Sequence, residues 1–253
     1  MNRLGNRVAL ITGAGDGIGK AAANLFAQEG ARVVVADLNP ELGRNTELQI
    51  REAGGEALFV QTDVTEDAQA ASAVAATLSK FGRLDVLYNC AGGSIAEDRP
   101  VTDVDLSVWD FTISLDLKGT LLLCRHAIPA IIESGGGSVI NMSSLAALQG
   151  VQTHVYSAAK GGVISLTRSM AASYSREGVR VNAICPGFVL SNRVSNRFEA
   201  GKENSVVERT RKRYPFGVGD PIDIAQIALF LATDESRMIN GAIIPAEGGM
   251  GTF

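Results

Sequence analysis

The chain has 253 residues, of which 46% are hydrophobic and 20% are charged, so it carries enough apolar material for a substantial core. Its formal net charge of −4 argues against a nucleic-acid partner, because duplex binding usually needs a basic face. The cysteines Cys90, Cys124 and Cys185 are odd in number and form no Cys-x-x-Cys pair. Neither a disulfide framework nor a metal site is therefore expected, and a reducing, cytoplasmic location fits.

The first residues lead almost directly into an apolar run that begins at Val8, which leaves no room for a signal peptide. No apolar run approaches the roughly 20 residues that a membrane span needs. The sequence therefore predicts a soluble protein with no membrane partner.

Apolar runs alternate with helical patterns almost to the end of the chain. Strands are expected at residues 8–11, 32–36, 57–60, 84–89, 138–142, 179–184 and 242–244. Helices are expected at about 20–29, after Asn39-Pro40, up to Phe81-Gly82, and at about 106–133, 155–177 and 222–232. Apolar strands separated by helices are typical of a parallel sheet covered on both faces. No linker divides the pattern, so we predict one doubly wound α/β domain over residues 1–253.

A glycine-rich turn at residues 12–19 joins the first expected strand to the first expected helix. Its glycines, Gly13, Gly15, Gly17 and Gly19, remove the Cβ atoms that would keep a phosphate away from backbone N–H groups. A turn of this kind at a helix N-terminus can hold a diphosphate. Taken alone, the pattern fits a plain turn equally well.

Asp37 follows the second expected strand and stands 20 residues after Gly17. An acidic side chain at this position can accept hydrogen bonds from an adenosine ribose and would repel a 2′-phosphate. Asp16 in the turn and Leu38 after Asp37 also offer no cation to such a phosphate. An Asp after a strand is often only a helix cap, but that reading leaves Asp16 unexplained. These residues therefore favour NAD over NADP.

Tyr156 and Lys160 are four residues apart in an expected helix and would lie on one face of it. An ammonium group beside a phenol favours the phenolate, which can then exchange a proton with a substrate oxygen. Most such pairs are mere surface neighbours. Here the helix follows the fifth expected strand, which ends in Ser143-Ser144, and a hydroxyl there could hold the same substrate oxygen.

Several short motifs follow one another along the chain. They are residues 12–19, Asp63-Val64, Asn89-Cys90-Ala91-Gly92, Ser143-Ser144, Tyr156 to Lys160, Pro186-Gly187 and Glu247-Gly248-Gly249. With this set the whole chain resembles the single-domain short-chain dehydrogenases/reductases. The resemblance implies a Rossmann fold and hydride transfer to or from a nicotinamide.

The resemblance also implies roles for individual residues. Tyr156 would be the acid/base, and Lys160 would bind the cofactor ribose and support the phenolate. The cofactor contacts would come from Gly13, Gly15, Asp16, Gly17, Ile18, Gly19, Asp37, Leu38, Asp63, Val64, Asn89, Ala91, Gly92, Tyr156, Lys160, Pro186, Gly187, Val189 and Ser191. Of these, Asp63 and Val64 would lie near the adenine, and Pro186, Gly187 and Val189 would flank the nicotinamide.

The chain departs from the family pattern at several positions. The usual spacing to the tyrosine picks Ser143 as the catalytic serine, whereas the strand register favours Ser144, which we prefer. Asp116 replaces an asparagine that in the family supports a water next to the lysine, so it is a catalytic candidate and a perturbed pH–rate profile is expected. Cys90 replaces a second asparagine, and Ser191 stands where a threonine commonly binds the carboxamide.

Residues 188–219 form an irregular stretch that is too long for a plain connection. Between Arg193 and Arg213 it holds seven basic and three acidic residues, a local charge of +4. Solvated surface helices are one interpretation. The other is a substrate loop whose basic side chains favour an anionic substrate.

The sequence thus predicts an NAD-dependent oxidoreductase that interconverts a secondary alcohol and its ketone. A catalytically silent NAD sensor of the same fold is an alternative. A serine hydrolase is disfavoured, because no Gly-x-Ser-x-Gly elbow occurs. His154, two residues before Tyr156, could reach the substrate, and Trp109 is expected to pack the long helix. The family resemblance further implies a homotetramer with contacts around Trp109, Tyr156 and the C-terminal segment.

Overall fold

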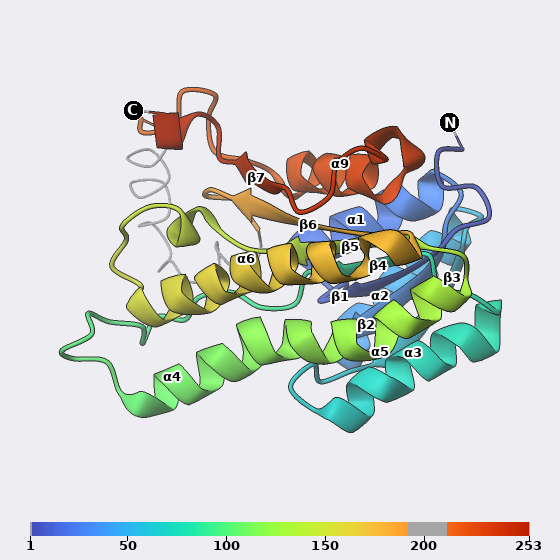
Figure 1. The fold of residues 1–253 in the computed structure, drawn as a ribbon, viewed down its shortest axis with the longest axis horizontal. Coiled ribbons are helices and arrows are strands. Elements are labelled where there is room, and N and C mark those ends of the chain that lie inside the picture. The colour runs from blue at the N-terminus through green and yellow to red at the C-terminus, as the bar shows by residue number, and fades with distance from the viewer. Residues whose placement is uncertain (1, 192–211, 253) are drawn as a thin grey trace.

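The structure is a computed structural model that describes residues 2–191 and 212–252, and within these ranges seven parallel strands form one sheet (Figure 1). The strand order is β3-β2-β1-β4-β5-β6-β7. The strands are β1 (Val8–Thr12), β2 (Arg32–Asp37), β3 (Glu56–Gln61), β4 (Val86–Asn89), β5 (Gly137–Met142), β6 (Val179–Pro186) and β7 (Ile243–Ala246). The predicted single domain with a doubly wound parallel sheet is confirmed.

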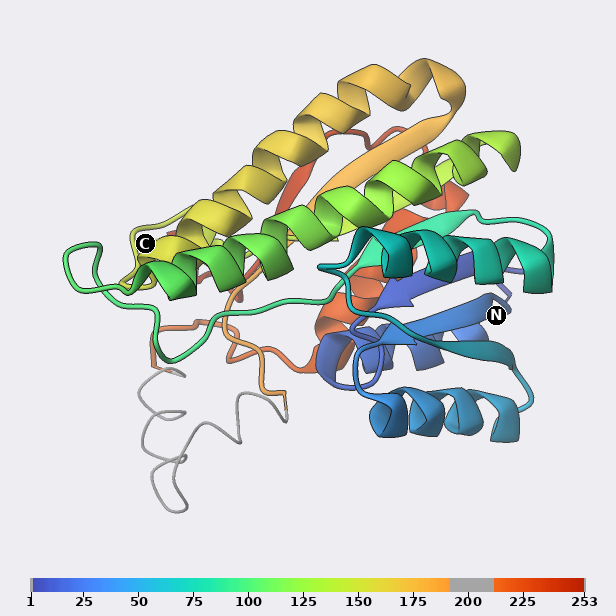
Figure 2. The ribbon, with the colours of Figure 1, turned by 90° about the horizontal axis from the view of Figure 1, so that it is seen from below.

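Helices cover both faces of this sheet. One face carries α1 (Gly17–Gln28), α2 (Pro40–Glu52) and α9 (Pro221–Ala232); the other carries α3 (Asp67–Phe81), α5 (Gly119–Glu133) and α6 (His154–Tyr174). Successive strand residues point to opposite faces, so on β1 Ala9 and Ile11 join the first core and Val8 and Leu10 the second. In both views α6 runs alongside the long helix formed by α4 (Leu106–Thr112) and α5 (Figure 2).

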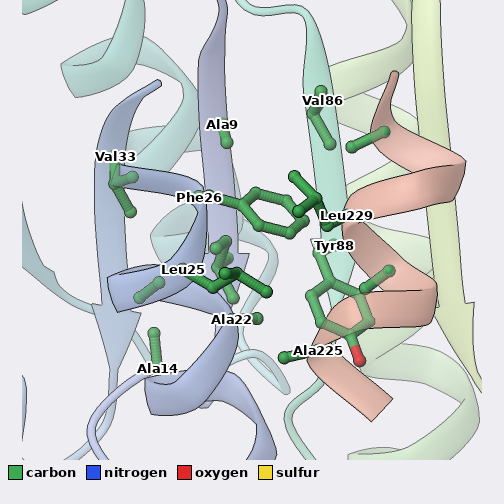
Figure 3. Packing of buried hydrophobic residues seen from close by; sticks show 14 of the residues in the cluster. Ala9, Ala14, Ala22, Leu25, Phe26, Val33, Val86, Tyr88, Ala225 and Leu229 are labelled. Atoms are coloured by element: carbon green, nitrogen blue, oxygen red, sulfur yellow. The ribbon is translucent and has the colours of Figure 1, made fainter. Parts of the chain in front are cut away.

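The first core is built around two aromatic rings. Phe26 of α1 and Tyr88 of β4 stack with their ring centroids 6.5 Å apart. Ala225 and Leu229 of α9 belong to the same buried cluster and approach the rings from the side (Figure 3). This packing joins the helix of the glycine-rich turn to the centre of the sheet.

The strand order creates a crevice next to β1. Ile11 of β1 pairs with Val35 of β2 on one side and with Tyr88 of β4 on the other. Along the chain, β2 and β3 are therefore added on one side of β1, and β4 is then added on its other side. Connections after β1 and β4 leave in opposite directions, and ligands bind at such a switch point outside the carboxyl ends of the strands.

The long helix predicted at 106–133 is divided in the structure. α4 ends at Thr112, a wider turn of π-helical type covers Ile113–Lys118, and α5 begins at Gly119. Asp116 lies in this turn and is fully buried. The helix predicted to end near 177 ends at Tyr174, because residues 175–177 form a tighter turn closed by Gly178 with φ of 78°. Among the described residues, no helix has the length and apolar character to cross a bilayer.

The predicted insertion at 188–219 is only partly described, since residues 192–211, which carry most of its charges, lie outside the described ranges. Its two ends are tied together. Val189 pairs with Gly219 as an isolated bridge, and the Phe188 N–H donates to the Tyr214 hydroxyl at 3.0 Å.

Candidate active site

A cavity of about 690 Å³ lies at the carboxyl ends of the central strands, a volume in the usual range for small-molecule and cofactor sites. It collects residues from distant parts of the sequence. Of the predicted site residues, those that line it are Gly13, Asp16, Gly17, Ile18, Gly19, Asp37, Leu38, Asp63, Val64, Ala91, Gly92, Ser144, Tyr156, Lys160, Pro186, Gly187, Val189 and Ser191. Gly15, Asn89 and Asp116 are not among the lining residues.

The glycine-rich turn leaves room at the beginning of α1. Gly13 has φ of 63°, and a Cβ on it would come within 2.9 Å of the Ala91 Cα. A Cβ on Gly19 would collide with the Gly13 carbonyl. Side chains at these positions would therefore displace the turn at the beginning of α1, where Gly17, Ile18 and Gly19 line the cavity.

Gly15 acts on Asp37 instead of lining the cavity. Its N–H donates to Asp37 Oδ2 at 2.8 Å, and the other carboxylate oxygen accepts from the Asn39 N–H at 2.9 Å. The helix-cap reading of Asp37 is wrong, because the Asn39 side chain caps α2 by accepting from Glu41 and Leu42 N–H. Each oxygen of Asp37 keeps further acceptor capacity toward the cavity.

Acidic groups lie at the end of the cavity where Asp37 is found. Asp63 Oδ1 accepts from the N–H and the hydroxyl of Thr65, at 2.9 and 2.7 Å, which fixes the turn after β3. Asp16, Asp37 and Asp63 all line the cavity, whereas Lys160 is the one basic side chain among its described lining residues. Among the described lining residues the carboxyl groups thus outnumber the basic side chains.

Lys160 is held by two oxygens at the other end. Its ammonium donates to Asp116 Oδ1 at 2.8 Å and to the Met142 carbonyl at 2.9 Å, and it lies 5.7 Å from the ring centroid of Tyr156. Burial lowers the pKa of Lys160, but the negative charge of Asp116, with those of Tyr156 and Cys90 when ionised, outweighs burial and raises it. Lys160 is therefore a fixed cation beside Tyr156.

Asp116 lies behind Lys160 and does not face the cavity. Its Oδ1 also accepts from the Gly93 N–H at 2.8 Å, and its Oδ2 has no hydrogen-bond partner in the described part of the chain. A Cβ on Gly92 would collide with the same carboxylate, so glycine is required there. Asp116 is therefore connected to the cavity through Lys160 and the backbone at Gly93.

The two candidate serines differ in their contacts. Ser143 is 1% exposed, and its hydroxyl donates to the Lys160 carbonyl at 2.9 Å, so its proton is already in use. The Ser144 hydroxyl accepts from the Ala146 N–H at 3.2 Å and keeps its own proton available. Both residues line the cavity.

Asn89 is the last residue of β4, and Cys90 follows it. The Asn89 amide points away from the cavity and donates to Asn141 Oδ1 at 2.9 Å and to Cys124 Sγ at 3.3 Å. It therefore links β4 to β5 and α5. Cys90 does line the cavity, and burial raises the pKa of its thiol to about 12, so it stays a small neutral side chain.

The histidines lie outside the cavity lining. His154 Nδ1 accepts from the Val101 N–H at 3.0 Å, and His126 Nε2 lies 2.8 Å from Asp67 Oδ1.

Sequence reasoning missed two positions. The Thr12 hydroxyl accepts from the N–H groups of Cys90 and Ala91, both at 3.1 Å. Asp98 accepts from two N–H groups at the beginning of α6. A threonine ending an expected strand was a usable signal for the first, whereas nothing near Asp98 in sequence points to α6.

The fold and this cavity define a Rossmann-type protein with a Tyr–Lys pair in a cavity at the carboxyl ends of the strands. A family model described as enoyl-(acyl carrier protein) reductase matches residues 13–251. A 2,5-dichloro-2,5-cyclohexadiene-1,4-diol dehydrogenase of Sphingobium indicum is 39% identical over 98% of this chain and 97% of its own. A cis-4-hydroxycyclohexanecarboxylate dehydrogenase of Sinomonas cyclohexanicum is 39% identical over 96% of each chain.

A solved structure gives the same result. The crystal structure of levodione reductase matches with a TM-score of 0.93 at 31% identity, covering 99% of each chain. The chain belongs to the short-chain dehydrogenase/reductase family and is an oxidoreductase of that family.

Proposed function

We propose that this protein is an NAD-dependent oxidoreductase that interconverts a secondary alcohol and its ketone, with Tyr156 as the acid/base. The observation that carries the proposal is the pairing of Tyr156 with the buried cation of Lys160, in the same cavity as the glycine-rich turn and Ser144. A Tyr–Lys pair on a surface helix would share a cavity with neither a glycine-rich turn nor a serine.

The cavity fits a nicotinamide dinucleotide. The first turn of α1 would hold the diphosphate, since the glycines leave the approach open and helix N-termini favour anions. Asp37 would accept from the adenosine ribose. The adenine side would be lined by Asp63, Val64, Ala91 and Gly92, and the nicotinamide side by Pro186, Gly187, Val189 and Ser191. Once bound, the nicotinamide supplies the acceptor or donor of a hydride.

Side chains of the protein would carry out the proton transfer. In the oxidation direction, the Tyr156 phenolate takes the proton from the substrate hydroxyl while the Ser144 hydroxyl donates to the same oxygen. The Lys160 ammonium stabilises the phenolate because it is fixed nearby by Asp116 and Met142. In the reduction direction the Tyr156 phenol returns the proton to the ketone oxygen.

The choice of NAD over NADP rests on the carboxylates. Asp37 is oriented by the Gly15 N–H, and Asp16 and Asp63 line the same region. A 2′-phosphate there would meet negative charges, with the nearest described lining cation at the opposite end of the cavity.

Two curated relatives suggest the first substrates to try. Their names describe alcohols on six-membered carbon rings, and one of these compounds carries a carboxylate. An anionic ring alcohol would also agree with the basic residues between 193 and 213. A panel of cyclic secondary alcohols, with and without a carboxylate, should be incubated with NAD or NADP and followed by absorbance of the reduced cofactor. Turnover with NAD supports the proposal, whereas NAD binding without turnover of any alcohol or ketone would favour the sensor.

We further propose a cytoplasmic homotetramer. The free thiols of Cys90, Cys124 and Cys185 suit a reducing compartment. Large apolar side chains on α4 and α5, among them Trp109 and Leu121, are exposed in the single chain and would be covered by other copies.

A further inference from the structure

Asp98 is a buried carboxylate in a segment whose other residues are exposed or half-buried. It lies in the irregular connection between β4 and α4, where it is 8% exposed and is the one buried residue between positions 90 and 107. Its neighbours Glu97 and Arg99 are both exposed. An acidic side chain is seldom buried unless specific partners compensate for the lost water.

The partners are at the beginning of α6. Asp98 Oδ1 accepts from the Val155 N–H at 3.2 Å, and Asp98 Oδ2 accepts from the Tyr156 N–H at 2.8 Å. These are the two N–H groups that an N-cap side chain normally satisfies. The N-cap residue itself, Thr153, makes no such bond. Asp98 therefore caps the helix from a segment more than fifty residues earlier in the chain.

The same segment makes a second contact with this helix turn. The Val101 N–H donates to His154 Nδ1 at 3.0 Å. At its other end the segment begins with Gly93 and Ser94, which line the cavity, and the Gly93 N–H donates to Asp116. One short segment thus links the cavity wall, the Asp116–Lys160 pair and the turn that carries Tyr156.

We propose that Asp98 is a positioning residue for Tyr156, fixing the first turn of α6 against the cavity wall at Gly93 and Ser94. The inference rests on the proposed role of Tyr156 as acid/base. A carboxylate at a helix N-terminus is held by two charge-assisted bonds and by the helix dipole, so it fixes both the axial position and the rotation of this turn. Small displacements of a catalytic group reduce the rate strongly.

The test compares Asp98→Ala with Glu97→Ala, which removes an exposed carboxylate from the same segment. A third variant combines Asp98→Ala with Thr153→Asp, which gives the helix a local cap but leaves the segment unattached. For each we would measure the melting temperature, kcat and KM for the alcohol, and KM for NAD.

Asp98→Ala should lower kcat/KM for the alcohol by about tenfold or more, with a raised KM for the alcohol and an unchanged KM for NAD. The double variant should regain its melting temperature but not its kcat/KM, and Glu97→Ala should behave like wild type. Loss of folded protein alone would lower kcat without changing either KM.

The inference is wrong if Asp98→Ala keeps the wild-type kcat/KM. It is also wrong if the double variant regains full activity, because Asp98 would then be only a helix cap. Should Asp98→Ala fail to fold, the double variant decides the question in the same way. Failure of the proposed function itself is distinguishable, because then either the wild type would turn over no alcohol or ketone, or Tyr156→Phe would retain turnover.

Discussion

At the scale of single residues, the contact between Asp116 and Lys160 favours the charged form of the lysine beside Tyr156. Both side chains are almost completely buried, and the Lys160 ammonium is fixed by one carboxylate oxygen and one carbonyl. A buried cation needs such partners, because desolvation alone would favour its neutral form. An asparagine at 116 would keep the shape of the contact but remove the compensating charge.

Asp116→Asn should therefore change the pH dependence of turnover. Burial lowers the pKa of Lys160, and the charge of Asp116 is the largest influence raising it. Without that charge Lys160 loses its proton at lower pH, so the alkaline limb of the pH–rate profile should move to lower pH. The same sign holds for stability, since the contribution of protonated Lys160 is present at lower pH and is lost as pH rises through its folded pKa.

The measurement is a kcat profile over pH for the wild type, for Asp116→Asn and for Asp110→Asn, which changes an exposed carboxylate of α4. Asp110→Asn should leave the profile in place. If Asp116→Asn has the wild-type profile and turnover, Asp116 is only structural.

At the scale of elements, the packing of α1 and α9 on β4 positions the glycine-rich turn. Phe26 is fully buried between Tyr88 and the α9 residues of the same cluster. Phe26→Ala should reduce the free energy of unfolding by about 3–5 kcal/mol, because it removes a large apolar group and leaves a cavity. Leu48→Ala on the exposed side of α2 should cost less than about 0.5 kcal/mol. Urea denaturation gives both values; a cost below about 1 kcal/mol for Phe26→Ala would contradict this packing.

The elements that sequence predicts well are those defined by local pattern. Runs such as Val33 to Ala36 give buried parallel strands, and the glycines of 12–19 mark the turn before α1. The π-type turn at Ile113–Lys118 could not be predicted, because no glycine or proline interrupts the helical pattern there. The capping of α6 by Asp98 could not be predicted either, because it depends on a contact that only the tertiary fold creates.

In the site, too, the features that depend on nearby residues could be predicted, and those that depend on distant residues could not. Tyr156 and Lys160 share a face because helical spacing requires it, and they line the same cavity as the glycine-rich turn. The direction of the Asn89 side chain was not predictable, because it depends on Asn141 from the neighbouring strand and Cys124 from a helix. The contacts of Ser143 and Ser144 likewise depend on how β5 meets α6.

At the scale of the whole molecule, the long helix α4–α5 exposes several large apolar side chains. Leu106 is 76% exposed, Phe111 51% and Leu121 47%. Trp109 is 46% exposed, so about half of it is covered within the single chain, and it is not among the residues that line the cavity. These side chains suit an interface between copies, because large exposed apolar patches mark interaction sites.

Light scattering after size exclusion should accordingly give about four times the chain mass of 26.5 kDa. Trp109→Glu should shift the population to smaller species, because it places a charge in the interface. Leu48→Glu, on an exposed apolar residue of α2, is the matched control and should leave the mass unchanged. A monomeric wild type at micromolar concentration would refute the tetramer.

The central claim is that Tyr156 transfers the proton in an NAD-linked alcohol–ketone reaction. Tyr156→Phe keeps the ring that lies near Lys160 and removes only the hydroxyl. We predict that NADH formation from the alcohol falls by about 10²–10⁴-fold, the usual contribution of a general acid/base, while the calorimetric Kd for NAD stays near that of wild type. Wild-type turnover in Tyr156→Phe, with NAD bound normally, would contradict the mechanism.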